Sequence, residues 1–136
     1  MNLLKAVKIA QSGLLAQRVR LNVTATNLAN AQVTRTLEGG PYRAKNVVLK
    51  AVPLDPATPF LQKVEVVAIK DDPSPFKEVY DPGHPDADER GIVKYPNVDV
   101  ITEMVELLSA SRAYEANLAV LSTTKSMYLR TLDLLK

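Results

Sequence analysis

The 136-residue sequence has no cysteine and no tryptophan, and it has a single histidine. Without thiols the chain cannot form a disulfide framework, a cysteine nucleophile, a zinc finger or an iron–sulfur site. A catalytic triad that uses histidine would depend on His84 alone. No apolar run approaches the roughly 18 residues that indicate a membrane-spanning helix. The N-terminal residues also lack the pattern of a removable signal peptide.

Proline is missing from both ends of the sequence. All nine prolines lie between Pro41 and Pro96. Because proline interrupts helices, the two ends are free to be helical and the middle is not. We therefore expect an α+β protein in which long N- and C-terminal α-helices pack as a coiled coil, with a small β-rich, proline-containing middle.

This distribution predicts three segments: an N-terminal axial helix and connector over 1–36, a β-rich or extended middle over 37–97, and a C-terminal axial helix over 98–136. The first segment carries five basic side chains and no acidic one, whereas the whole chain has a formal net charge of only +2. So small a net charge argues against a nucleic-acid partner. The cationic N-terminus leaves an amphipathic membrane-surface helix open as an alternative function.

Apolar residues recur at alternating spacings of three and four in both terminal segments. A 3.5-residue repeat that persists over four or more heptads is typical of a coiled-coil seam. An amphipathic helix lying on a globular core is the other interpretation. Helices of roughly 43 and 55 Å would exceed any core that this chain supplies. The predicted assembly seam consists of Leu3, Val7, Leu14, Leu21, Leu28, Val100, Met104, Leu107, Tyr114, Leu118, Leu121, Tyr128 and Leu132.

The middle segment has β-branched runs separated by proline, glycine and aspartate. These runs predict short strands within residues 44–52, 62–70, 76–80 and 91–95. Between the first two runs, proline recurs at every third residue over 53–59. Such spacing favours a polyproline II connector.

Residues 81–91 gather His84 and several carboxylates, which is the composition of a candidate metal site. The order resembles the start of an EF-hand loop, but Arg90 takes the fifth position and Asn97 the twelfth. We therefore expect a solvated acidic turn. No catalytic, cofactor-binding or metal-ligating residues are predicted, and the chain is not expected to be an enzyme or to bind a small-molecule substrate.

Both ends carry recognisable motifs. The stretches 12–17, 20–23 and 27–30 resemble the N-terminal signature of bacterial flagellar axial proteins. The stretches 97–100, 103–104, 109–117 and 124–127 resemble the matching C-terminal signature. The motif residues are Ser12, Gly13, Leu14, Asn22, Asn27, Asn30, Asn97, Ser111, Tyr114 and Asn117.

Within these axial proteins, residues 81–88 and 95–98 resemble the FlgC family of proximal-rod proteins of the flagellar basal body. The resemblance implies a structural subunit whose terminal helices assemble into a hollow periplasmic drive shaft for motility. The implied partners are copies of the chain, other flagellar rod proteins, inner-membrane ring and rod-junction proteins, and the flagellar export apparatus. The resemblance also implies type III export without signal-peptide cleavage, and no cofactor. A coiled-coil adaptor protein is the remaining alternative.

Overall fold

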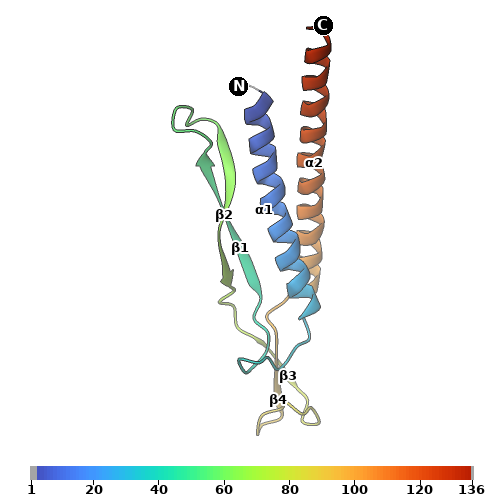
Figure 1. Ribbon diagram of the computed structural model, residues 1–136. Coiled ribbons are helices and arrows are strands. Elements are labelled where there is room, and N and C mark those ends of the chain that lie inside the picture. Colours follow the sequence, from blue (N-terminus) through green and yellow to red (C-terminus); the bar gives the residue numbers. More distant parts are fainter. Residues whose placement is uncertain (1–2, 136) are drawn as a thin grey trace.

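Two long helices form the body of the molecule. The computed structural model describes residues 3–135. Helix α1 (Leu3–Ala29) and helix α2 (Val100–Asp133) run antiparallel and lie side by side, and the second reaches beyond the start of the first (Figure 1). Neither described helix has the length and hydropathy that a membrane span requires.

Two antiparallel hairpins make up the middle of the chain. Strands β1 (Lys45–Pro53) and β2 (Gln62–Asp71) form a long hairpin against α1, on the side away from α2 (Figure 1). Strands β3 (Lys77–Tyr80) and β4 (Ile92–Tyr95) form a short hairpin beyond the end of α1. The expected α+β class with terminal helices and a β-rich middle is confirmed.

The start of α2 is fixed by a capping side chain. The N-cap is Asp99, whose carboxylate accepts from the N–H of Ile101 at 3.2 Å. The hydroxyl of Thr102 donates to the same carboxylate at 2.9 Å. These bonds satisfy donors that a helix start leaves unpaired. They also lower the pKa of Asp99, with the Thr102 bond as the largest cause.

The polyproline II prediction for residues 53–59 is wrong. Pro53 ends β1, and the residues after it form the loop between β1 and β2, which the N–H of Leu54 closes by donating to the Leu61 carbonyl at 2.7 Å. The Asp55 carboxylate accepts from the N–H of Ala57 at 2.9 Å and forms a turn. Because antiparallel strands need a reversal of the chain, this aspartate turn outweighs the extended preference of the prolines.

The core of the described chain is thin and contains small residues. The largest fully buried side chains are Val93, Val98, Asn27 and Pro96, so no leucine, isoleucine or phenylalanine is among them. Along the helices the buried apolar residues are alanines, at positions 10, 16 and 110. Many large apolar side chains remain exposed, and α2 carries more of them than any other element. The isolated chain therefore buries little of the apolar surface that its helices carry.

Candidate assembly interface

The predicted seam on α1 lies where this helix is covered. Its members Leu3, Val7, Leu14, Leu21 and Leu28 are all partly buried. At the open end of the helix pair, Leu3 and Val7 line an apolar groove of about 320 Å³ together with residues of α2. At this end, the α1 seam thus forms one wall of the groove between the two helices.

The predicted seam on α2 is split between two environments. Leu107, Tyr114 and Leu121 are partly buried. The intervening buried positions are Ala110 and Thr124, each three residues after a seam member, rather than the expected positions four residues after it. This rotation leaves the rest of the predicted seam exposed: Val100, Met104, Leu118, Tyr128 and Leu132.

Small residues explain the rotation. A Cβ atom added to Gly13 would lie 2.7 Å from Oδ1 of Asn117, so the two helices cross closely at this level. The amide of Asn117 is held in place by donating to the Ala113 carbonyl at 2.8 Å. Close approach brings the small-residue side of α2 to α1, while the seam residues Met104 and Leu118 remain exposed.

A second motif asparagine ties the long hairpin to α1. Asn27 is 1% exposed and its Oδ1 accepts from the Tyr42 hydroxyl at 2.9 Å and from the backbone N–H of Lys45 at 3.0 Å. Its Nδ2 donates to the Lys45 carbonyl at 2.9 Å. Both backbone groups of the first β1 residue are thus bonded to one side chain.

Asn97 performs a similar task ahead of α2. Its Oδ1 accepts from the N–H of Ala44 at 2.8 Å, and its Nδ2 donates to the carbonyls of Asp72 and Ser74 at 3.2 and 3.0 Å. Arg43 donates to the same two carbonyls, at 2.7 and 3.0 Å. The two asparagines therefore hold the ends of both helices to the chain that enters and leaves the long hairpin.

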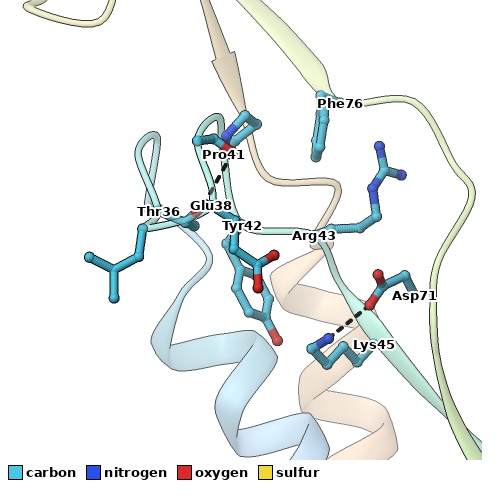
Figure 2. Close-up of a pocket in the computed structure, with 10 residues that line it drawn as sticks. Thr36, Glu38, Pro41, Tyr42, Arg43, Lys45, Asp71 and Phe76 are labelled. Carbon is cyan, nitrogen blue, oxygen red and sulfur yellow. Dashed lines mark hydrogen bonds and ion pairs between the residues drawn. The ribbon is translucent and has the colours of Figure 1, made fainter.

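An open groove of about 540 Å³ lies beside this junction (Figure 2). Several of its polar side chains are paired within the chain. The Arg43 guanidinium stacks 4.2 Å from the centre of the Phe76 ring, and Lys45 Nζ lies 2.8 Å from an oxygen of Asp71. In the described part of the chain, no three histidine, aspartate or glutamate side chains are grouped to hold a metal ion.

The other motif residues also have local roles. The Ser12 hydroxyl accepts from the N–H of Val64 at 3.1 Å and thereby fastens β2 to α1. Asn30 donates to the Thr26 carbonyl at 2.8 Å in the last turn of α1. Leu14, Ser111 and Tyr114 are partly buried, whereas the side chain of Asn22 is exposed. Sequence reasoning did not find Tyr42 or Arg43, because their roles depend on residues distant in the chain.

Comparison with known proteins assigns these motifs to a protein family. A profile described as "Flagella basal body rod protein" matches residues 8–35, and one described as "Flagellar basal body rod FlgEFG protein C-terminal" matches residues 89–134. The flagellar basal-body rod protein FlgC of Salmonella typhimurium is 51% identical, over 98% of each chain. The chain belongs to the FlgC family. The FlgC proteins of Yersinia enterocolitica and Borreliella burgdorferi are 50% and 40% identical, covering 98% and 100% of this chain and 98% and 99% of their own lengths.

Membership of the FlgC family establishes a structural subunit of the flagellar basal-body rod, and not an enzyme. The resemblance found in the sequence is therefore confirmed. In this FlgC-family chain, the motif residues Ser12, Gly13, Asn27, Asn97 and Asn117 all make contacts within the chain. These residues therefore shape the subunit itself.

The loop around His84 is a turn that packs on the connector after α1. Nδ1 of His84 accepts from the N–H of Asp86 at 3.0 Å, and the ring meets the Tyr95 ring edge-on at 6.2 Å. The carboxylate of Asp86 accepts from the Thr34 hydroxyl at 2.8 Å and pairs with Arg35 at 3.1 Å. The acidic loop of the FlgC-family chain thus fixes the direction in which the chain leaves α1.

A carboxylate lies near the Asn27 junction. Burial raises the pKa of Glu103 above its ordinary value of 4.5, and a hydrogen bond with Asn27 opposes the rise. The neighbouring carboxylates of Glu106, Asp72 and Asp99 add to it. Burial also raises the pKa of the Tyr42 hydroxyl, which donates to Asn27. The junction therefore favours the neutral forms of both groups.

This pKa shift predicts a pH-dependent effect of Glu103→Gln on stability. The folded chain keeps the Glu103 proton to higher pH than the unfolded chain, so between the two pKa values the folded state binds more protons. The contribution of Glu103 to stability consequently falls as the pH rises from about 4.5 through the folded pKa, and is constant above it. In the glutamine variant residue 103 cannot ionise, so this fall in stability with pH does not occur. Its free energy of unfolding relative to the parent should increase between about pH 4 and pH 7.

Urea unfolding of parent and variant across this pH range measures the difference. Glu115→Gln, on the exposed side of α2, is the matched control and should show a smaller change. A difference between Glu103→Gln and the parent that stays constant with pH would contradict the prediction.

Proposed function

We propose that this rod subunit belongs to the proximal rod, where its terminal helices pack as a coiled coil and join neighbouring subunits into the wall of a hollow periplasmic drive shaft. The proposed neighbours are copies of the chain, other rod proteins, and the ring and rod-junction proteins of the inner membrane. The chain reaches the rod through the flagellar export apparatus.

The exposed half of the α2 seam carries this proposal. Met104 and Leu118 are 57% and 51% exposed, although they continue the same heptad repeat as the partly buried Leu107, Tyr114 and Leu121. Fully burying a leucine or methionine stabilises a protein by about 1.5–3 kcal/mol. Several such residues on each subunit would offset the cost of ordering long helices once a neighbour covers them. One face of α2 therefore contacts α1 of its own chain, and another face is available to a neighbouring subunit.

Replacement of Leu118 by aspartate tests the proposal. The side chain is exposed in the isolated subunit, so the purified variant should have the helix content and unfolding midpoint of the parent. In a buried interface the new charge would cost several kcal/mol. We expect cells with Leu118→Asp to lose swimming and their basal bodies to lack the subunit, as judged by soft-agar motility and immunoblotting.

Leu118→Met is the matched control, because it keeps an apolar side chain of similar volume and should swim normally. Leu21→Asp and Leu107→Asp should also block assembly, with a loss of subunit stability because both side chains are partly buried. Normal swimming of the Leu118→Asp strain would show that this face of α2 is not an assembly surface.

A further inference from the structure

Sulfur occurs in this chain only as methionine. The sequence has three methionines and no cysteine, so no thiol competes for an oxidant. Met104 and Met127 lie in the described part of the chain, and both are on α2. Their side chains are 57% and 52% exposed. A peroxide in the surrounding solution therefore reaches both thioethers in the isolated subunit.

Met104 lies in the middle of an uncovered apolar patch. On a helix surface, the neighbours of a side chain are the residues three and four positions away. Around Met104, all four of these neighbours are apolar: Val100, Ile101, Leu107 and Leu108. Three of the four are exposed, and Leu107 is partly buried. A polar atom added to Met104 would find no side-chain donor among these neighbours.

Met127 has the opposite surroundings on the same helix. Its four corresponding neighbours are all polar: Thr123, Thr124, Arg130 and Thr131. Met127 also lines an open hollow of about 210 Å³ together with Ser122, Thr123, Ser126 and Arg130. Hydroxyl and guanidinium groups donate hydrogen bonds. A polar atom added to Met127 therefore has donors beside it on its own helix.

We propose that Met104 is an oxidation-sensitive position in the exposed half of the α2 seam, and that Met127 is an oxidation-tolerant one. The oxidant is a peroxide. The Met104 sulfur gives up two electrons and bonds to one oxygen of hydrogen peroxide, the O–O bond breaks, and the other oxygen leaves as water with both protons. The product is a sulfoxide, which replaces an apolar thioether by a polar acceptor. The inference rests on the proposed assembly of rod subunits through this part of α2, and it adds a regulation of that surface.

The sulfoxide at Met104 acts on assembly and leaves the isolated subunit intact. In the isolated chain water solvates the new oxygen, because the Met104 side chain is more than half exposed. A neighbouring subunit that covers the apolar patch removes this water. An unpaired polar group in such a contact weakens association by about ten- to a hundredfold. Methionine sulfoxide reductases reverse the modification, so the loss of assembly is reversible.

Oxidation of the purified full-length chain tests the chemical step. After treatment with hydrogen peroxide, peptide mass spectrometry should find one added oxygen atom on Met104 and one on Met127. The Met127→Leu variant isolates the effect of Met104, and its helix content by circular dichroism should not change on oxidation. Resistance of Met104 under conditions that oxidise Met127, or a loss of helix content in the oxidised Met127→Leu chain, would contradict the proposal.

Glutamine substitution tests the consequence in cells, because glutamine is an unbranched polar side chain like the sulfoxide. We expect Met104→Gln to reduce the amount of subunit in isolated basal bodies, judged by immunoblotting, by about tenfold or more. Met127→Gln is the matched control and should be incorporated like the parent. Equal incorporation of the two glutamine variants would overturn the proposal.

Leu118→Asp separates this inference from the proposed function on which it rests. Normal incorporation of Met104→Gln together with exclusion of Leu118→Asp would refute the sensitivity of Met104 alone. Normal incorporation of both variants would refute the use of this part of α2 in assembly, and with it both proposals.

Discussion

Replacing Asn27 by alanine should lower the free energy of unfolding of the isolated subunit by about 2–4 kcal/mol, because partly buried backbone groups lose their hydrogen-bond partner. The side chain bonds to both the N–H and the carbonyl of Lys45 and also accepts from Tyr42. Its loss leaves these groups unpaired at the point where the long hairpin begins. Urea unfolding followed by circular dichroism measures the change.

Two substitutions sharpen this prediction. Asn22→Ala removes an exposed amide from the same helix and should change stability by less than about 0.5 kcal/mol. Asn27→Asp keeps an oxygen acceptor but loses the donor to Lys45 and places a second carboxylate near Glu103. Its destabilisation should therefore grow as the pH rises and both carboxylates ionise. Equal stability of Asn27→Ala and Asn22→Ala would mean that the asparagine junction does not hold the hairpin.

The helices and strands were predictable because their signals are local. Proline-free ends with a heptad repeat predicted α1 and α2, and β-branched runs predicted all four strands. The loop after Pro53 was not predictable from proline spacing, because the pairing of β1 with β2 decides its shape. Such pairing joins residues far apart in the sequence, and no local propensity reports it.

The division of the seam into covered and exposed residues could also not be predicted from the sequence. The heptad pattern identified Leu107, Leu118 and their equivalents as one surface, but it could not say which of them face α1. That choice depends on where small residues allow the helices to approach, as at Gly13 and Ala110. The seam as an assembly surface stays a prediction, whereas its division between a covered and an exposed half is a property of the folded chain.

Enlarging Gly13 should separate the two helices and destabilise the subunit. A leucine at this position overpacks the contact with Asn117, and overpacking typically costs about 1–3 kcal/mol. Alanine is expected to be nearly neutral, because the gain of about 0.5–1 kcal/mol from removing a glycine from a helix offsets the displacement of the Asn117 amide. The free energies of unfolding of Gly13→Ala and Gly13→Leu should therefore differ widely, although both variants add a side chain at the same position.

The partner residue supplies the decisive comparison. Shortening Asn117 to alanine removes the atoms nearest to the new side chain and should recover part of the stability lost in Gly13→Leu. In the parent background the same change should cost less than Gly13→Leu does. If Asn117→Ala changes stability equally in both backgrounds, the two residues are not coupled, as expected only for side chains that do not touch. The close crossing of α1 and α2 would then be wrong, and with it the reason why Met104 and Leu118 of the α2 seam remain exposed.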